Sequence, residues 1–321
     1  MDEFELIRRY FAKLTEPRDD VALGIGDDAA LLRPPRGHEV VVTTDTLVGG
    51  RHFPDDTDPQ AVGWKSLAVN LSDLAAMGAE PRWFTLALTL RMADPDWLAG
   101  FAAGLGALAR EAGVALVGGD TTQGALSITI TAMGTVPAGK AIRRSGAKVG
   151  DAICVTGTLG DAALALRLGQ DGAGARGEAR TSDLENLRQR LNRPVPRVAV
   201  GSVLRNLAHA AIDLSDGLAG DLSHILEASG VGAEIRANKL PMSKAFKSLS
   251  DPDTRLELQI SGGDDYELCV CLPAREVEAL RKRLKVPLTE IGRVVKGKDL
   301  NILDARGKKI AIEPYGYRHF S

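Results

Sequence analysis

The segment DPQAVGWKSLAVNLSDLAAMGA, residues 58–79, decides the predicted fold class of this chain of 321 residues. Its apolar residues, such as Leu67 and Leu71, recur at the i, i+3, i+4 and i+7 positions of an amphipathic helix. EVVVTTDTL, residues 39–47, comes before this helix, and WFTLALTLRM, residues 83–92, follows it. Both stretches are rich in β-branched and apolar residues, as strands are. A helix between two strands predicts an α/β fold.

The same alternation continues along the chain. DPDWLAGFAAGLGALAREAG, residues 94–113, predicts a helix that begins at an Asp-Pro pair, and two more strands are predicted over 115–122 and 126–136. GQDGAGARGEARTSD, residues 169–183, lacks periodicity and predicts a mobile loop. A basic, Gly-rich segment then divides the chain into three predicted ranges: an N-terminal domain over 1–138, a linker over 139–150 and a C-terminal domain over 151–321.

The bulk composition excludes several classes of protein. Hydrophobic residues make up 44% and charged residues 26%, as in soluble globular proteins, and the net charge of −2 favours neither nucleic acid nor a membrane surface. The chain has no apolar run of about 18 residues, and MDEFELIRRYF is too charged for a signal peptide. The spacing of Cys154, Cys269 and Cys271 does not fit a metal site, and YELCVCL resembles a buried strand. We therefore expect a reducing cytoplasm.

Aspartates recur where the predicted strands give way to loops. They are Asp45 in VVTTDT, Asp120 in LVGGDTT, Asp213 and Asp216 in AIDLSDG, and Asp264 in SGGDDYEL. A single aspartate beside glycine is adequately explained as a turn residue. Five such positions in one chain favour binding loops at strand ends.

Asp73 adds a helical position to these acids. Ser66, Asn70 and Asp73 share one face of the predicted helix, opposite its apolar stripe. This face is either an ordinary solvated surface or part of a site, because the helix follows the strand of Asp45 and can return toward it.

Carboxylates that converge need bound cations. Two unit charges about 4 Å apart repel by about 4 kcal/mol at an effective dielectric constant of 20. Carboxylates and hydroxyl groups, without a cluster of His or Cys, are the hard oxygen ligands that suit Mg²⁺. Because Mg²⁺ commonly takes further ligands from substrate phosphates, the acids predict phosphate chemistry.

The motif LGIGDDAALL, residues 23–32, formally fits the dinucleotide pattern G-x-G-x-x-A. That site needs a helix at the second glycine, but RPPRG soon ends any helix, and Asp27 and Asp28 would repel a pyrophosphate. The chain also lacks a Walker A loop and the H-R-D and D-F-G motifs of protein kinases. We therefore expect Gly24 and Gly26 to admit a phosphate that is held through a metal bound by an aspartate.

Eight separated blocks, in order and across nearly the whole chain, resemble the thiamine-monophosphate kinase family. These blocks are GIGDDAALL, TTDTLVGGRHF, KSLAVNLSDLAAMGAEP, GGDTT, RSGAKVGD, TGTLGD, AIDLSDGL and SGGDDYEL. The resemblance implies a two-domain α/β (α+β) fold shared with aminoimidazole ribonucleotide synthetase and selenophosphate synthetase. It implies an N-terminal domain that binds ATP and metal, and a C-terminal domain that completes the active site. It also implies ATP-dependent conversion of thiamine monophosphate to the diphosphate, with several Mg²⁺ ions, in a homodimer.

The resemblance further implies roles for single residues. The implied metal ligands are Asp28, Thr43, Thr44, Asp45, Asp73, Asp120, Asp213 and Asp216. The implied ATP contacts are Gly119, Asp120, Arg144 and Ser215, and the implied substrate contacts are His52, Asp264 and Tyr317. Two departures stand out: position 264 is Asp where the family pattern has Glu, and an expected nucleotide-contacting aromatic has no clear equivalent beyond Phe101.

Sequence alone leaves plainer explanations open for three of these residues. Arg144 also fits a surface charge of the linker, Tyr317 a packing aromatic, and His52 an exposed loop histidine. The acceptor is itself a phosphate monoester, with a second pKa of about 6, so it is largely an anionic nucleophile at neutral pH. We therefore expect direct in-line transfer, without a general base or a phosphoenzyme.

Two alternatives to this activity remain open at the level of sequence. One is another ATP-dependent synthetase of the same superfamily. Selenophosphate synthesis normally uses a reactive cysteine or selenocysteine near the N-terminus, and the first 150 residues here contain no cysteine. The other alternative is a non-catalytic protein that binds nucleotide or metal.

Overall fold

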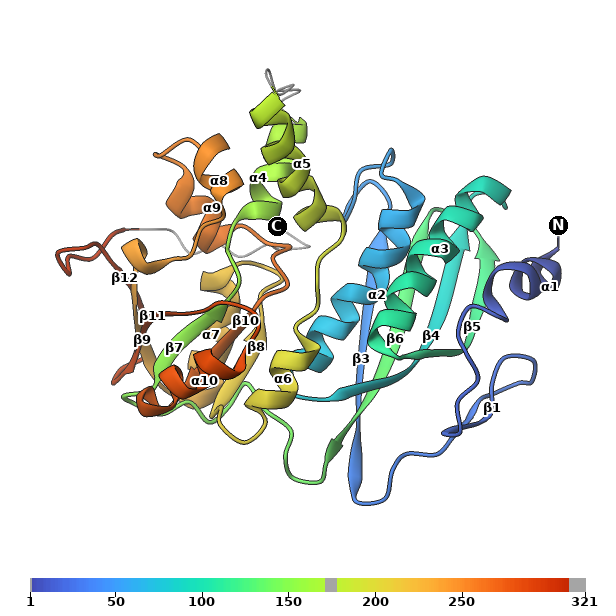
Figure 1. Cartoon of the computed structure of the whole chain (residues 1–321), viewed down its shortest axis with the longest axis horizontal. Coiled ribbons are helices and arrows are strands. Elements are labelled where there is room, and N and C mark those ends of the chain that lie inside the picture. Colours follow the sequence, from blue (N-terminus) through green and yellow to red (C-terminus); the bar gives the residue numbers. More distant parts are fainter. Residues whose placement is uncertain (1, 171–177, 312–321) are drawn as a thin grey trace. The chain divides into compact units, whose positions relative to one another are not determined.

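The computed structural model describes residues 2–170 and 178–311 (Figure 1). The chain divides into two compact units. Unit 1 comprises Met1–Leu74 and Gly78–Ala141, and unit 2 comprises Ala75–Met77 and Ile142–Ser321. The main division therefore falls between residues 141 and 142, inside the range 139–150 that the sequence predicts as a linker.

Unit 1 is built on a four-stranded sheet in the order β3-β6-β4-β5. β4 and β5 are parallel, and the other neighbours are antiparallel. The strands are β3 (His38–Val48), β4 (Glu80–Leu90), β5 (Ala115–Gln123) and β6 (Ser127–Pro137). Helices α2 (Pro59–Ala76) and α3 (Pro95–Ala112) lie against one face of this sheet (Figure 1). These six elements confirm the strands and helices predicted for this half of the chain.

The boundaries of α3 follow from local signals in its sequence. The Asp94 side chain accepts hydrogen bonds from the backbone N–H groups of Asp96 and Trp97, and Pro95 occupies the first turn. Gly113 ends the helix in a left-handed conformation with φ of 64°.

The beginning of the chain adds short elements to unit 1. These are α1 (Glu3–Leu6), the π-helical turn η1 (Ile7–Phe11), β1 (Val21–Leu23) and β2 (Leu31–Leu32). β1 and β2 form a two-stranded antiparallel sheet that encloses the Gly-rich motif. Val21 and Leu32 pack beside Trp83 of β4 and Val117 of β5, which are buried on the sheet face opposite Phe84.

Unit 2 is built on a six-stranded sheet in the order β12-β9-β11-β7-β10-β8. All its neighbours are antiparallel except β12 and β9. The strands are β7 (Ala152–Thr156), β8 (Ala210–Asp213), β9 (Gly232–Arg236), β10 (Leu268–Leu272), β11 (Leu288–Val295) and β12 (Leu300–Leu303). Every residue of β7 and β10 is buried, which explains their unbroken apolar sequences.

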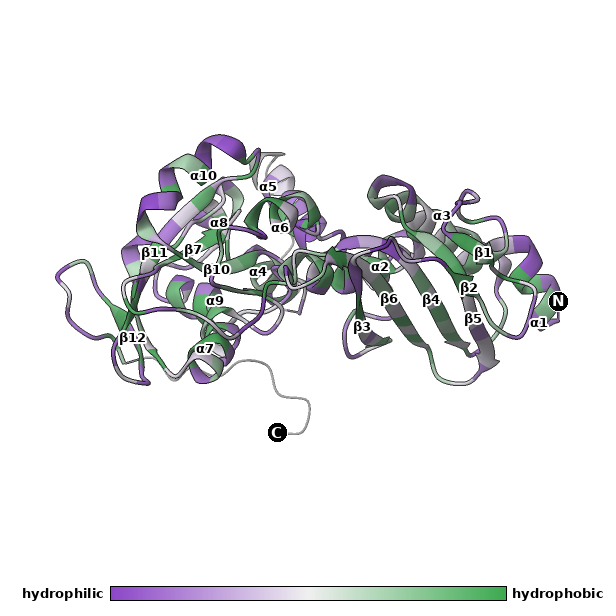
Figure 2. Ribbon diagram, turned by 90° about the horizontal axis from the view of Figure 1, so that it is seen from below, coloured by the Kyte–Doolittle hydropathy of each residue, from purple (hydrophilic) through white to green (hydrophobic). Residues whose placement is uncertain are grey.

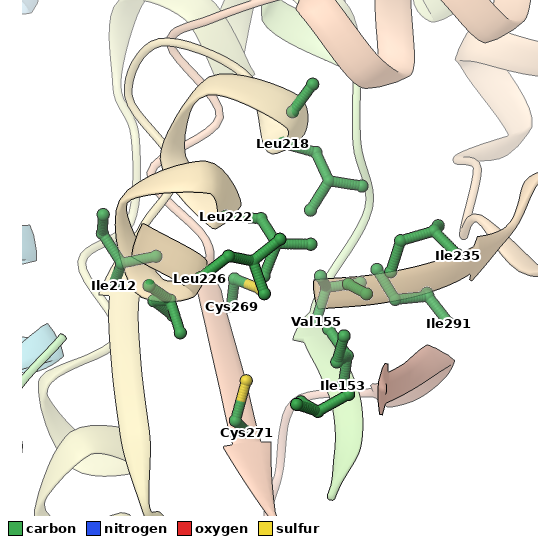
Figure 3. Close-up of a cluster of buried hydrophobic side chains, with 14 of the residues drawn as sticks. Ile153, Val155, Ile212, Leu218, Leu222, Leu226, Ile235, Cys269, Cys271 and Ile291 are labelled. Carbon is green, nitrogen blue, oxygen red and sulfur yellow. The ribbon is translucent and has the colours of Figure 1, made fainter. Parts of the chain in front are cut away.

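Helices pack on both faces of this sheet. On one face, Figure 3 shows Leu218, Leu222 and Leu226 of α7 directed toward Val155 of β7 and Cys269 of β10. α6 and α10 pack on the other face, and Figure 2 shows the hydrophilic outer side of α10. The helices are α4 (Asp161–Gln170), α5 (Glu178–Asn192), α6 (Val198–Leu204), α7 (Leu218–Ser229), α8 (Lys244–Leu249), α9 (Arg255–Ser261) and α10 (Val277–Arg283). Two 3₁₀ turns complete the unit: η2 (Ala237–Lys239) and η3 (Ala274–Glu276).

The prediction of a loop over 169–183 is wrong at both ends. Residues 169–170 end α4, and residues 178–183 begin α5. The helical signal lies further along the chain, because Leu184, Leu187 and Leu191 are buried at helical spacing. Those three residues lie beyond the stretch in which periodicity is missing.

The cysteines confirm the structural interpretation of their sequence pattern. Cys154, Cys269 and Cys271 are buried free thiols within unit 2. Burial raises the pKa of Cys154 to about 12 and also raises the pKa values of Cys269 and Cys271. These thiols are therefore packing groups rather than nucleophiles. Among the described residues, no helix is long and apolar enough to cross a membrane.

Candidate functional site

The loop between β8 and α7 carries three of the predicted site residues. Asp213 is the last residue of β8, and Ser215 and Asp216 follow before α7 begins at Leu218. The Asp221 carboxylate, in the first turn of α7, accepts hydrogen bonds from the backbone N–H groups of Ser215 at 3.0 Å and Asp216 at 3.1 Å. Asp221 therefore determines the shape of this loop.

Asp221 is 3% exposed, and its burial raises its pKa to about 7, although hydrogen bonds from the loop oppose this rise. Asp221 is not among the residues predicted from the sequence. The signal that would have found it is a carboxylate in the first turn of a helix that follows a Ser-Asp-Gly turn, where it can bond to backbone N–H groups.

A second loop lies beside the first within unit 2. It runs from Gly262 to Glu267, between α9 and β10. The Asp264 N–H donates to the carbonyl oxygen of Ser215 at 2.9 Å, and the Tyr266 N–H donates to that of Leu214 at 2.8 Å. The structure therefore brings together the strand-end acids after β8 and the predicted substrate contact at Asp264. The sequence prediction that Asp213 ends a strand is confirmed.

Arg144 belongs to the same region of unit 2. Its positive charge favours the ionised form of Asp221 and so lowers that pKa. Its backbone is held by Ser229 at the end of α7, whose hydroxyl donates to the Arg144 carbonyl oxygen at 3.3 Å. The same hydroxyl accepts from the N–H of Gly146 at 3.1 Å and of Ala147 at 3.2 Å. Ser229 is not among the residues predicted from the sequence, because a single serine at a helix end carries no distinctive signal.

In unit 1, Thr43 and Asp73 come into contact. The Thr43 hydroxyl donates a hydrogen bond to Asp73 Oδ2. Asp45 points to the same face of β3 as Thr43, because it lies two residues further along the strand. The helix face that carries Asp73 also contains Ser66 and Asn70, which are 2% and 0% exposed. The alternative of a solvated polar face is therefore wrong, and this part of α2 faces β3.

Asp45 and Asp120 lie within strands rather than at strand ends, so the prediction for these two positions is wrong. β3 continues for three residues beyond Asp45 to Val48, and β5 continues beyond Asp120 to Gln123. The threonines that follow each aspartate favour continued strand pairing, and β3 is paired with β6 along its whole length.

Thr44 and Asp120 point to the opposite face of the sheet from Thr43 and Asp45. Thr44 Oγ1 lies 2.9 Å from Thr131 Oγ1 of β6. Asp120 is paired with Ala87 of β4, and Ala87 is paired with Thr129 of β6. Paired residues point to the same face, and Thr129 shares its face with Thr131 because the two are two positions apart, so Asp120 lies on the face of Thr44. The sheet therefore separates these acids and hydroxyls into two groups, one on each face.

Gly119 lies beside Asp120 where β5 comes close to β4. A Cβ at this position would lie 1.9 Å from the Leu86 carbonyl oxygen, and φ is 154°. Only glycine fits there. Asp28 is exposed in the loop between β1 and β2, where its N–H donates to Asp27 Oδ1 at 2.9 Å.

His52 is half-buried in the loop after β3. The Val48 N–H donates to His52 Nδ1 at 3.0 Å, and the His52 N–H donates to the Val48 carbonyl oxygen at 3.0 Å. Because Nδ1 accepts a hydrogen bond, a neutral imidazole carries its proton on Nε2. In that tautomer, Nε2 is the donor of the ring. Tyr317, the remaining predicted site residue, lies outside the described residues.

The donor set fits Mg²⁺ chemically. Across residues 2–170 and 178–311, no three or more His, Cys, Asp or Glu side chains group closely enough to hold a metal ion by themselves. Mg²⁺ does not need such a cage, because it commonly takes one or two carboxylates together with water and substrate phosphates. The carboxylate and hydroxyl oxygens of Asp73 and Thr43 are of the type that it prefers.

Comparison with known proteins identifies the class. Residues 26–136 match the N-terminal domain of the AIR synthase related proteins, and residues 148–304 match the C-terminal domain of the same group. These two domains define an AIR synthase related protein. E. coli HypE, a hydrogenase maturation protein, shares this fold, with a TM-score of 0.76 at 20% identity over 99% of this chain and 97% of that chain.

Closer relatives identify the family. The chain is 47% identical over 325 residues to the thiamine-monophosphate kinase of Salmonella typhimurium, which covers 99% of this chain and 98% of the relative. A crystal structure of thiamine-monophosphate kinase from Stenotrophomonas maltophilia K279a has a TM-score of 0.88 at 50% identity and covers 97% of this chain and 98% of that chain. AaThiL complexed with AMPPCP and TMP has a TM-score of 0.78 at 32% identity and covers 92% of each chain. The chain belongs to the thiamine-monophosphate kinase family and is therefore an enzyme of the kinase class.

Proposed function

We propose that this enzyme transfers the γ-phosphoryl group of ATP to thiamine monophosphate, giving ADP and thiamine diphosphate. The names of its relatives and the AaThiL complex with AMPPCP and TMP support this substrate pair. The observation within this chain that carries the proposal is the contact between two loops of unit 2. Ser215, a proposed ATP contact, accepts the N–H of Asp264, a proposed substrate contact, at 2.9 Å.

The ATP contacts that we propose are Gly119, Asp120, Arg144 and Ser215. A guanidinium such as that of Arg144 matches phosphate oxygens in both charge and geometry. Gly119 supports the assignment because it leaves backbone exposed next to Asp120.

The thiamine phosphate would be bound by His52, Asp264 and Tyr317. His52 supports this role through the proton that a neutral ring carries on Nε2, which can donate to a phosphate oxygen. Thiamine carries a cationic thiazolium ring, and a carboxylate and an aromatic face both attract a cation. Asp264 and Tyr317 are of these two types.

Several Mg²⁺ ions complete the proposal. The residues that would hold them are Asp28, Thr43, Thr44, Asp45, Asp73, Asp120, Asp213 and Asp216. Bound Mg²⁺ would supply positive charge that offsets the repulsion between two phosphorylated molecules.

The acceptor phosphate needs no general base, so the role of the protein is to orient it in line with the γ-phosphorus. The described structure nevertheless contains a histidine beside an acid. His209 Nδ1 lies 2.8 Å from Asp151 Oδ2. His209 precedes β8, whereas Asp213 ends that strand, so this pair lies at the opposite end of β8 from the proposed site. Direct transfer without a phosphoenzyme is therefore the step that we propose.

We also propose a cytoplasmic homodimer. The three buried free thiols fit a reducing compartment. β3 is an edge strand of the unit 1 sheet, and Val40 and Val42 on its open face are 45% and 59% exposed. A second copy of the chain would cover these apolar side chains. Light scattering should give twice the mass of one chain for the wild-type protein. Val42→Lys should shift the measured mass toward that of the monomer. A monomeric wild-type protein would contradict the proposal.

One experiment tests the activity. The purified protein is incubated with ATP, MgCl₂ and thiamine monophosphate, and ADP and thiamine diphosphate are quantified by chromatography. The two products should appear in equal amounts and should disappear when EDTA is added or thiamine monophosphate is omitted. ATP binding without turnover would favour a non-catalytic protein, and ADP release without thiamine diphosphate would favour another synthetase.

A further inference from the structure

Asp264 and Tyr266 have an unusual backbone conformation. Their φ angles are 66° and 48°, and no other residue except glycine has a positive φ within the described ranges. The left-handed region is sterically unfavourable for both side chains, and especially for a bulky one such as tyrosine. Such residues persist where surrounding contacts hold them, and they concentrate at functional sites.

The residues that alternate with Asp264 and Tyr266 are Asp265 and Glu267, which are buried acids that accept hydrogen bonds. Asp265 is 4% exposed, and both of its carboxylate oxygens accept the Gly160 N–H at 3.0 Å. Glu267 is 0% exposed and accepts hydrogen bonds from Thr156 at 2.6 Å, Arg190 at 2.7 Å and Arg197 at 2.6 Å. Tyr266 is therefore held on both sides along the chain.

The backbone of the same loop is held as well. The N–H groups of Asp264 and Tyr266 donate to Ser215 and Leu214, as described above. The Leu214 N–H donates in return to the Glu267 carbonyl oxygen at 2.8 Å. With both its backbone and its flanking side chains held, Tyr266 has little freedom to move its ring.

The Tyr266 hydroxyl donates a hydrogen bond to Asp264 Oδ1 at 3.1 Å, and Tyr266 is 7% exposed. We infer that Tyr266 is a positioning residue, which aims the Asp264 carboxylate at the cationic ring of thiamine monophosphate. This inference rests on the proposed function of Asp264. It assigns to Tyr266 no contact with the substrate, because its effect passes through the carboxylate.

Tyr266→Phe removes the donating hydroxyl and leaves the ring. We expect KM for thiamine monophosphate to rise about five- to tenfold, as for the loss of one typical hydrogen bond. KM for ATP and kcat should stay within about twofold, and the melting temperature should change little, since the ring and backbone contacts remain. The matched control is Tyr10→Phe, which removes a hydrogen bond from Tyr10 to the Pro95 carbonyl oxygen in unit 1 and should leave both KM values unchanged.

A double-mutant cycle separates positioning from a general structural effect. Asp264→Asn should raise KM for thiamine monophosphate, and the variant that carries both Tyr266→Phe and Asp264→Asn should match Asp264→Asn alone. Additive effects, or an unchanged KM in Tyr266→Phe, would overturn the inference.

A failure of the proposed activity can be distinguished from a failure of the inference about Tyr266. If the wild-type protein forms no thiamine diphosphate, the proposed activity fails. Binding of thiamine monophosphate, measured by calorimetry, then becomes the readout for the four proteins of the cycle: the wild type, the two single variants and the double variant. A Kd that weakens in Tyr266→Phe would still support positioning. Absence of binding to the wild-type protein would overturn both ideas.

Discussion

Two acids of unit 1 and two acids of unit 2 are held in different ways. In unit 1, Asp45 and Asp120 lie inside regular strands, and the two-residue alternation of each strand decides which face they reach. In unit 2, Asp216 and Asp264 lie in loops whose shape depends on buried acids such as Asp221 and Glu267. Strands direct side chains through their own geometry, whereas loops need partners from elsewhere in the chain. The units should therefore respond differently to mutation.

The largest effect is expected at Glu267, whose buried carboxylate is shared by Arg190 and Arg197. Glu267→Gln removes the acidic partner of Arg197 and the nearer of two acidic partners of Arg190, whose Nε also lies 3.8 Å from Asp161 Oδ2, and it should lower the free energy of unfolding by about 3–5 kcal/mol. Urea unfolding measures this change. Glu278→Gln is the matched control, because its ion pair with Arg281 is on the exposed surface of α10 and should contribute little. Equal effects of the two substitutions would contradict the comparison.

The next effect is expected in activity at Asp45. Asp45→Asn keeps the size of the side chain within β3 and should lower kcat by about 10²- to 10³-fold, while the circular dichroism spectrum and melting temperature stay near wild type. Steady-state kinetics at saturating Mg²⁺ measure the loss. Asp96→Asn, at an exposed position in the first turn of α3, serves as the control. Near-normal turnover in Asp45→Asn would refute its metal role.

A smaller effect tests the contact between Thr43 of β3 and Asp73 of α2. Thr43→Val removes the hydroxyl that donates to Asp73, and we expect kcat to fall about tenfold, as for the loss of a hydrogen bond to a charged group. Thr46→Val removes a hydroxyl that lies 2.8 Å from Thr129 on the other face, and it should change kcat by less than about twofold. If Thr46→Val were the more damaging of the two, the proposed role of the Thr43 hydroxyl would be wrong.

The smallest effect concerns a half-exposed ion pair in unit 1. Hydrogen bonds from Arg18, at 2.8 and 2.7 Å, hold the pKa of Asp20 below its ordinary value of 3.8. The ionised form is favoured in the folded state, so the stabilisation is present above about pH 4 and is lost as the pH falls further. Asp20→Asn should cost less than about 1 kcal/mol at pH 7. The difference from wild type in urea unfolding should shrink toward pH 3, and a growing difference would contradict this sign.

Much of the architecture could be predicted from the sequence because it depends on local periodicity. The helix over 58–79 and the strands around it carry their own patterns, and the structure confirms them as α2, β3 and β4. The strand-to-loop position of Asp213 was also predictable, since an apolar run ends there. The face to which each side chain of β3 and β5 points could not be predicted. The threonines around Asp45 and Asp120 lack the alternation of apolar and polar residues that indicates a buried face.

The supporting residues of the loops could not be predicted for a different reason. Ser229 and Glu267 look like ordinary polar residues in sequence, and their roles depend on partners far along the chain. Glu267, for example, contacts Thr156, which lies 111 positions away. Gly157 shows the same dependence: a Cβ there would lie 2.0 Å from Glu267 Oε1, so the need for glycine is set by a distant carboxylate.

The distribution of two residue types gives this molecule separate natural reporters. All three cysteines lie in unit 2, whereas all three tryptophans, Trp64, Trp83 and Trp97, lie in unit 1. Because the thiols are buried, a maleimide dye would label them only when unit 2 opens, while tryptophan fluorescence would follow unit 1. The wild-type chain can thus reveal which half unfolds first, without any engineered label.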